Sequence, residues 1–318
     1  MYVDFALLIF TVKTDLEKRI YQAQCIGNVE PIEYMIPYPS MRSLIEGQNI
    51  KFSEQVIIED SSITNLKFYG LVQQTAHWLD SIGLQPRERI IISELEYPQA
   101  EILLYGIWHL GAIAVIPESM DVDRVKQKSD TSLLVDQGID LFENIKDFPT
   151  KFEPKYKPLL NDEALVTFEK EQGIRLSHYN LLVNVNSIQK ALSIKSRTRY
   201  KSSLEPRSTA WVVFQAILPI YCGCIFDAVN PDFTIGKAEN DFNLRYDLKN
   251  MVDYSKTDIA ICPENSAGLS LDGSAIHLTD FKLENGKVKL QGHSVMMGYM
   301  DDSENESSFR NKALYIPV

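Results

Sequence analysis

Two short, continuous runs of apolar residues constrain the fold of this chain most strongly. They are RIIIS at residues 89–93 and AIAVI at residues 112–116, and neither run alternates with polar residues. A strand that is apolar at every position is buried on both faces, which is typical of a parallel sheet covered by helices. Residues 98–110 lie between the two runs and predict a helix that ends at Gly111. This order predicts two parallel strands joined by a crossover helix.

The segment before these strands extends the pattern. Residues 54–60, EQVIIED, predict a short strand with its apolar centre buried. Thr64 is a suitable N-cap for a helix that runs through Ser81, and Gly83 stands where a glycine commonly follows a helix end. The sequence therefore predicts a β-α-β-α-β unit built on a parallel sheet.

Later segments predict further helices and strands, and the spacing of the apolar residues changes near the end of the chain. From Gly268 the apolar residues form short alternating runs, which predict a β-rich region. Asn285-Gly286 lies between two such runs and is a strong signal for a tight hairpin turn. The charged residues 301–306 predict a solvated loop, and residues 5–12 predict a buried strand or helix edge. The other expected elements are helices after Asp121 and from Ser177, a helix and then a strand within 211–229, and strands at 132–136 and 164–168.

This order of elements predicts an α/β fold. Stacked parallel-sheet α/β subdomains are followed by a smaller, barrel-like β-rich region. The expected division is a first α/β subdomain at 1–160, a second at 161–267 and the β-rich region at 268–318.

The charge of the chain argues against two classes of partner. It has 32 basic and 43 acidic residues, which give a net charge of −11. Such a surface repels the phosphates of nucleic acids and anionic lipids, so we expect neither a nucleic-acid nor a membrane partner. No run approaches the ~20 apolar residues of a membrane span. The N-terminus also lacks the basic start of a signal peptide, and we therefore expect a cytoplasmic protein.

The cysteines favour the same compartment. Only Cys222 and Cys224 lie close together in the sequence, with one residue between them. Zinc-ligand pairs usually leave about two to four residues between the ligands. Thiols without a paired pattern fit a reducing cytoplasm, in which they pack as small apolar residues. We expect no metal site.

Two segments resemble motifs of one enzyme superfamily. Residues 173–182, GIRLSHYNLL, are similar to the pattern G-V-x-L-S-H-x-N-L, and residues 292–299, GHSVMMGY, are similar to G-P-x-V-M-x-G-Y. Both patterns belong to adenylate-forming enzymes, which include acyl-CoA synthetases, luciferases and peptide-synthetase adenylation domains. The resemblance implies the large N-terminal domain of these enzymes, whose stacked α/β subdomains and barrel-like region agree with the elements predicted above. Weaker matches follow the family's order at residues 83–90, 109–115 and 218–224.

The resemblance implies a reaction in two steps. In these enzymes a carboxylate attacks the α-phosphate of ATP to give an acyl-adenylate, and the sulfur of coenzyme A then displaces AMP. A loop with the pattern T-S-G-T-T-G-x-P-K-G holds the phosphates, which need hydrogen-bond donors and positive charge. ATP or AMP, Mg²⁺ and CoA are therefore the cofactors implied for this chain if the ancestral site survives.

The corresponding loop of this chain is altered. Residues 167–173, TFEKEQG, form a shorter loop with one glycine, no serine and two glutamates, and carboxylates repel a triphosphate. The resemblance leaves Lys170 and Gly173 of this loop as candidate cofactor-binding residues of a remnant nucleotide site. Glu264 is the third candidate, as the counterpart of the family's Mg²⁺-binding glutamate. Lys170 has an alternative interpretation as a solvated loop lysine.

Other catalytic positions of the family lack a clear counterpart. The ribose-binding aspartate is missing from residues 314–318, LYIPV. Ser208 lies nearest to the position of a usual histidine, and His178 is expected to be a structural residue. The C-terminal lid domain of the family, which carries the lysine that drives adenylation, lies outside this chain. We therefore assign no catalytic residue and no metal ligand.

These observations favour a degenerate acyl-CoA synthetase-like, AMP-binding protein without ligase activity on its own. Such a protein would retain a remnant cleft for an acyl group, a nucleotide or CoA. One alternative is an active ATP-dependent acid–CoA ligase that a separate chain completes with the C-terminal domain. A second is a non-catalytic interaction or oligomerisation subunit, for instance a homodimer. A third is an unrelated α/β enzyme whose motif matches arise by chance.

Overall fold

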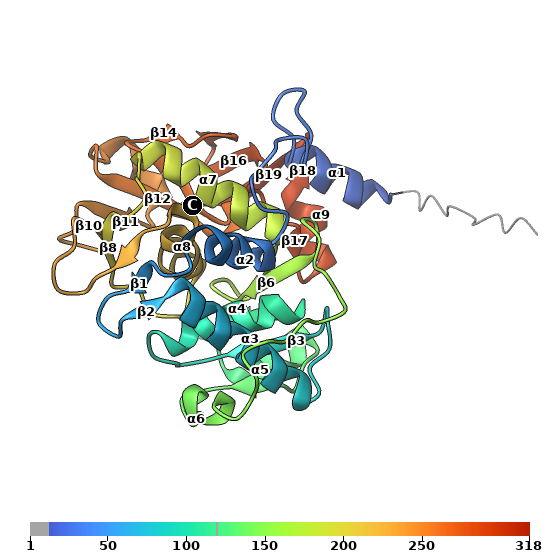
Figure 1. Ribbon diagram of the computed structural model, residues 1–318. Coiled ribbons are helices and arrows are strands. Elements are labelled where there is room, and N and C mark those ends of the chain that lie inside the picture. Colours follow the sequence, from blue (N-terminus) through green and yellow to red (C-terminus); the bar gives the residue numbers. More distant parts are fainter. Residues whose placement is uncertain (1–12, 119) are drawn as a thin grey trace, which may run out of the picture.

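The computed structural model describes residues 13–118 and 120–318, which form a mixed α/β fold with three sheets. The prediction for residues 5–12 lies outside the described residues. Two large, mainly parallel sheets and one small antiparallel sheet confirm the predicted fold class. In Figure 1 the short helices α5 (Val122–Ser129) and α6 (Leu141–Ile145) lie at one end of the molecule, and the strands of the small sheet lie at the other.

The six-stranded sheet contains the two apolar runs. Strands β3 (Arg89–Ile92) and β4 (Ile113–Ile116) are parallel neighbours, and β4 also pairs in parallel with β6 (Glu163–Thr167). β4 is buried at every position, as a strand covered on both faces must be. The sheet is completed by β5 (Leu134–Val135), β7 (Ile174–Ser177) and β17 (Gly298–Tyr299).

The helix between β3 and β4 lies inside the protein. α4 (Gln99–Leu110) is buried from Ala100 through Leu110 and contacts both α2 (Met41–Phe52) and α3 (Asn65–Ser81). A mainly apolar helix can be buried all round, and its buried polar residues Glu101 and His109 have hydrogen-bond partners. The predicted helix ends are confirmed: Thr64 caps α3, and Gly111 ends α4 with a φ of 85°.

The nine-stranded sheet holds a strand that we expected elsewhere. Strand β1 (Val56–Ile58) pairs in parallel with β9 (Ile225–Phe226), so it does not join β3 and β4 in one sheet. The β-α-β-α-β prediction is therefore wrong for its first strand. The local pattern identifies a buried strand, but the sheet it joins depends on partners far along the chain. The other strands of this sheet are β2 (Ile63–Thr64), β8 (Arg199–Ser202), β10 (Phe233–Gly236), β11 (Phe242–Arg245), β12 (Asp258–Cys262), β13 (Ala267–Leu271) and β14 (Ser274–Ala275).

The four-stranded sheet is the β-rich region. Strands β15 (Thr279–Glu284) and β16 (Lys287–Gly292) form an antiparallel hairpin, and its turn residues Asn285 and Gly286 have φ values of 50° and 68°. Positive φ at both positions is the geometry that the Asn-Gly pair predicts, so the hairpin is confirmed. Strands β18 (Phe309–Arg310) and β19 (Ala313–Pro317) complete the sheet.

Residues 301–306 are not the loop that we expected. They begin the short helix α9 (Asp302–Ser308), whose N-cap Asp301 accepts a hydrogen bond from the backbone N–H of Ser303. Asn305 is its buried residue. The helix has no apolar stripe, so its sequence carries no helical periodicity to detect.

Two helices cross the centre of the molecule close to the predicted positions. α7 (His178–Leu192) begins at Ser177, whose hydroxyl accepts a hydrogen bond from the N–H of Asn180 as predicted for an N-cap. The segment 211–222 begins as a π-helix, η1 (Trp211–Ile217), and continues as α8 (Leu218–Cys222). The Leu218 N–H donates to the Val213 carbonyl five residues earlier, the spacing of a π-helix, and Pro219 follows in the first turn of α8.

The remaining helices are α1 (Asp15–Ala23), the 3-10 helix η2 (Leu248–Asp253) and the 3-10 turn η3 (Pro263–Asn265). The division at 1–160, 161–267 and 268–318 stays a prediction. The sheets do not follow this division, because β6 and β7 of the second range belong to the same sheet as β3 and β4 of the first range.

Candidate functional site

A cleft lies at the carboxyl ends of parallel strands from both large sheets. Its volume is about 470 Å³. Ligands of open α/β folds bind outside the carboxyl ends of such strands, so this edge is the candidate functional site. The lining residues follow β4, β6, β8, β10 and β11, and they are Glu118, Glu169, Leu204, Glu205, Arg207, Ser208, Lys237 and Tyr246.

Glu169 is the titratable residue at the end of β6. Its Oε1 accepts hydrogen bonds from the backbone N–H and the hydroxyl of Thr209. Burial raises the pKa of Glu169 to about 7, against the lowering effect of the Thr209 hydrogen bonds. The carboxylates of Glu118 and Glu264 raise the pKa further. Glu169 can therefore hold or release a proton near neutral pH.

Lys170 and Glu264 form an ion pair beside Glu169. The Lys170 Nζ lies 2.5 Å from the Glu264 Oε1, and the side chain of Glu264 is only 1% exposed. Tyr299 donates its hydroxyl to the same oxygen at 3.1 Å. The thiol of Cys262 lies 3.5 Å from the other oxygen, Oε2. Lys170 is thus an ion-paired lysine that keeps partial contact with solvent.

Three segments far apart in the sequence build this pair. Lys170 lies in the loop after β6, Glu264 in η3 after β12, and Tyr299 in β17 at the sheet edge. The backbone N–H of Met296 donates to the Glu264 carbonyl at 2.9 Å and ties η3 to the segment before β17. Two of the three candidate cofactor-binding residues therefore lie in contact with each other.

Gly173, the third candidate, shapes the loop. Its N–H donates to the Lys170 carbonyl at 3.0 Å, which closes a turn. Its φ is 69°, and an added Cβ would lie 2.7 Å from the Met300 Cγ and 2.8 Å from the Phe168 Cε1. Only glycine fits here, since both the backbone conformation and the close packing exclude a side chain.

The residues of the cleft and the ion pair beside it do not fit a magnesium triphosphate. Mg²⁺ prefers carboxylate oxygens, and both oxygens of Glu264 already have partners. A triphosphate needs free positive charge, and Lys170 is neutralised by Glu264. Arg207 lies 3.7 Å from both Glu94 and Glu205, so Lys237 is the one cation of the lining that forms no ion pair among the described residues. The glutamates that line the cleft would repel phosphate oxygens.

Of the eight residues that line the cleft, sequence reasoning noted only Ser208. Glu169 and Tyr246 line the cleft, although neither was a candidate. A usable signal was present for Glu169, because it directly follows a predicted buried strand whose carboxyl end faces a cleft. Ser208, the nearest counterpart of the family's histidine, does line the cleft. Its hydroxyl interacts with Tyr246.

His178 is buried, and its Nδ1 lies 3.4 Å from the backbone N of Met41, a donor. Burial lowers the pKa of His178 to about 4, as expected for a structural histidine. Across residues 13–118 and 120–318, no three His, Cys, Asp or Glu side chains gather in a way that could hold a metal ion. Over the same residues, no helix is long and apolar enough to cross a membrane.

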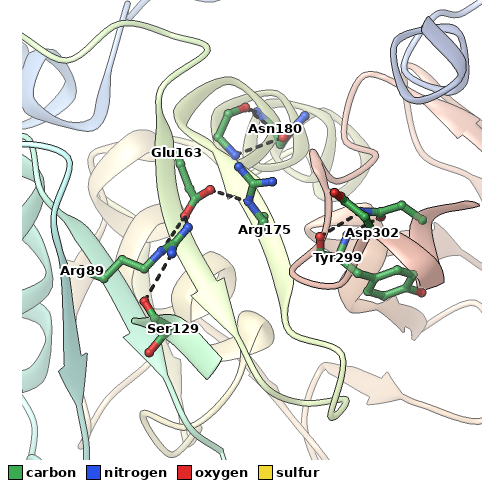
Figure 2. Close-up of polar contacts among 9 residues, drawn as sticks. Arg89, Ser129, Glu163, Arg175, Asn180, Tyr299 and Asp302 are labelled. Carbon is green, nitrogen blue, oxygen red and sulfur yellow. Dashed lines mark hydrogen bonds and ion pairs between the residues drawn. The ribbon is translucent and has the colours of Figure 1, made fainter. Parts of the chain in front are cut away.

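The opposite edge of the six-stranded sheet carries an ion-pair network, which Figure 2 shows. Glu163, the first residue of β6, accepts hydrogen bonds from Arg89 at 2.8 and 3.0 Å and from the Arg175 Nε at 2.6 Å. Arg89 also donates to the Ser129 carbonyl at 3.3 Å. The network joins β3, β6 and β7 at the end of the sheet that lies away from the cleft. Its ion pairs hold these three strands together.

Comparison with known proteins identifies the fold. No model of a protein family and no curated protein matches the sequence. Solved structures do match. The anthranilate CoA ligase AuaEII in complex with anthranoyl-AMP matches with a TM-score of 0.74 and 13% identity, over 88% of this chain and 74% of that chain.

Two further structures agree. The O-succinylbenzoate CoA synthetase MenE from Bacillus subtilis matches with a TM-score of 0.70 and 13% identity, over 87% of this chain and 75% of that chain. The N-terminal domain of FACL13 from Mycobacterium tuberculosis matches with a TM-score of 0.69 and 12% identity, over 88% and 95% of the two chains. Such low identities establish fold and not activity. The chain therefore has the fold of the large N-terminal domain of adenylate-forming enzymes.

Proposed function

We propose that this chain binds a small organic ligand in the cleft and does not form acyl-adenylates on its own. The observation that carries the proposal is the buried ion pair between Lys170 and Glu264, which lies where the resemblance puts the phosphates and Mg²⁺. A second, weaker support is Glu169 at the end of β6, in the loop that corresponds to the family's phosphate loop.

The energetics of the pair support this proposal. A triphosphate could use Lys170 only if the lysine left Glu264, whose buried carboxylate would then keep Tyr299 and Cys262 as its partners. Breaking a buried ion pair costs about 3–5 kcal/mol, and the 38% exposure of Lys170 reduces this to ~2–4 kcal/mol. Each 1.4 kcal/mol is about a factor of ten in affinity. The pair alone would therefore weaken nucleotide binding by roughly two orders of magnitude.

The cleft lining favours a different ligand chemistry. Glu169 offers a carboxyl group for a hydrogen-bond donor or an amine, while Arg207 and Lys237 supply positive charge. Leu204 and the ring of Tyr246 add apolar surface. Such a mixture suits an organic molecule with both polar and apolar groups better than a polyphosphate.

The test is pyrophosphate release from Mg-ATP with a panel of aliphatic, aromatic and amino acids. We expect none from this chain alone, and release would contradict the proposal. Release only after addition of a separate chain that carries a C-terminal lid domain would favour the alternative of a completed acid–CoA ligase.

Binding is tested separately by ligand-observed NMR with a fragment set that contains amines and carboxylates. We expect binding fragments to lose affinity in Glu169→Gln and to keep it in Glu171→Gln, an exposed residue that pairs with Arg124 outside the cleft. Fragments that bind both variants equally would place the ligand elsewhere.

Two further properties belong to the proposal. The four free cysteines support a cytoplasmic location. A homodimer stays an open alternative to a monomer. Light scattering over a range of protein concentrations distinguishes the two.

A further inference from the structure

A second hollow region lies between α2, α3 and the segment 148–158. It consists of two adjoining hollows, of about 660 and 350 Å³, which share Asn49, Tyr69 and Glu153 in their walls. None of its lining residues lines the cleft at the carboxyl ends of the strands. This second region, here called the α2–α3 groove, is therefore separate from the candidate functional site.

The wall formed by segment 148–158 is fixed by hydrogen bonds. The Phe152 N–H donates to the Gln73 Oε1 at 3.0 Å, and the Phe152 carbonyl lies 2.9 Å from the His109 Nε2. Gln74 donates to the Phe148 carbonyl at 2.7 Å. Arg42 donates to the Pro154 carbonyl at 3.3 Å. The groove is thus already formed in the free chain, which lowers the entropic cost of binding.

The larger hollow is mainly apolar. Leu66 and Leu71 of α3 line it, and Leu66 is 51% exposed to solvent. Gly70 lies between them. It leaves empty the space next to Thr150 that a Cβ would occupy, 3.5 Å from the Thr150 Cβ. Ile50 borders the smaller hollow and is 84% exposed. Both hollows therefore present apolar surface to solvent.

The rim of the α2–α3 groove is positively charged, although the chain as a whole is acidic. Lys67 and Lys151 line the larger hollow and Lys157 lines the smaller one. Within residues 13–118 and 120–318 none of these lysines forms an ion pair. The carboxylates of the groove, Glu46 and Glu153, both pair with Arg42. The single Arg42 guanidinium balances only one of these two carboxylates, and the three lysines still leave the groove with a net positive charge.

We propose that the α2–α3 groove binds a free, single-chain amphiphile with an anionic head group. Its alkyl chain would lie along Leu66 and Leu71, and its head would reach Lys67 and Lys151. The apolar wall matches the chain and the unpaired lysines match the head, so the complementarity is both apolar and electrostatic. A second copy of this protein is a poor occupant, since it carries the same net charge of −11.

The test is calorimetric titration of the whole chain with dodecanoate, below its micelle concentration. Dodecyltrimethylammonium, with the same alkyl chain and the opposite charge, is the matched ligand control. We expect saturable binding of dodecanoate and binding of the cationic amphiphile that is weaker by about tenfold. No binding of dodecanoate, or equal binding of both amphiphiles, would overturn the proposal.

Variants locate the site. The double variant Lys67→Glu/Lys151→Glu should weaken dodecanoate binding by about tenfold, because it reverses two rim charges. Leu66→Asp should weaken it similarly, and its exposed position keeps the fold intact. Lys282→Glu, an exposed change in β15 far from the groove, should have no effect. Equal affinity in all variants, with matching circular dichroism spectra, would overturn the proposed location.

Discussion

Removal of one partner of the ion pair beside the cleft should show how much Glu264 depends on Lys170. The substitution Lys170→Met keeps the aliphatic part of the side chain and removes the charge. Glu264, whose side chain is 1% exposed, would then lose its cationic partner and keep the Tyr299 hydroxyl and the Cys262 thiol. A buried carboxylate without a counter-charge is strongly destabilising.

The expected magnitude follows from burial. Loss of one partner of a buried pair costs about 3–5 kcal/mol, and partial exposure of Lys170 lowers the estimate for Lys170→Met to ~2–4 kcal/mol. The reverse change, Glu264→Gln, should cost only ~1 kcal/mol, since Lys170 is 38% exposed and its amine can turn to water. The double variant should be close to Glu264→Gln in stability, so the coupling energy equals the loss in Lys170→Met, ~2–4 kcal/mol.

The assay is urea unfolding near neutral pH, followed by tryptophan fluorescence, for the four members of this double-mutant cycle. Burial opposes the charge on Lys170, but the Glu264 carboxylate and its hydrogen bond outweigh it and raise the pKa of the amine above 10.5. A raised pKa means that the pair stabilises the folded state below pH 10.5 and is lost as the pH rises through the higher folded value. The cycle therefore measures the fully formed pair at neutral pH.

Additive effects of the two changes would refute this reasoning. So would a Lys170→Met variant as stable as the unmodified chain, because Glu264 would then not depend on the lysine. A loss in Glu264→Gln that exceeds the loss in Lys170→Met would show that Lys170, and not Glu264, is the partner that depends on the pair.

Four further changes test other parts of the structure. Gly173→Ala should destabilise the chain by ~2–4 kcal/mol through its positive φ and its contacts with Met300 and Phe168. Gly286→Ala, at a similar φ in open space, should cost only ~1 kcal/mol, and thermal unfolding of the two variants measures the difference. The pKa of Glu169 is raised to about 7, so the unmodified chain should lose stability as the pH rises from 4.5 to about 7. Urea unfolding of Glu169→Gln should show no such loss of stability with pH. An equal dependence of stability on pH in both proteins would contradict the assignment to Glu169. Glu163→Gln removes the charge between Arg89 and Arg175 and should cost ~2–4 kcal/mol, with part of the loss recovered by added salt, as measured by urea midpoints with and without sodium chloride.

Local signals in the sequence predicted local structure well. Thr64 and Ser177 cap helices as expected, because a hydroxyl bonds to an N–H only a few residues away. Asn285-Gly286 forms its turn for a similar reason, since the backbone conformation depends on those two residues. Such features need no knowledge of distant partners.

Features that depend on distant partners were beyond the same reasoning. Strand β1 was recognised as a strand, but its pairing with β9 joins residues that are far apart in the sequence. Lys170 and Glu264 are 94 residues apart in the sequence, and no hydrophobic periodicity indicates that they are in contact. The raised pKa of Glu169 results from burial, and this burial depends on how segments far apart in the sequence pack around the side chain. The family resemblance located Lys170 and Glu264 as candidates, and the structure shows that they neutralise each other.

The central claim is that the ion pair replaces the nucleotide site of this fold. Its most direct test is thermal unfolding of the chain with ATP, AMP and CoA, each with and without Mg²⁺. A ligand that binds only the folded state at about a hundredfold excess over its Kd adds ~2.7 kcal/mol of stability. We predict no shift of the melting temperature with any of the three at millimolar concentration. A clear rise with Mg-ATP would contradict the claim, because the cleft would then still hold a triphosphate in spite of Lys170 and Glu264.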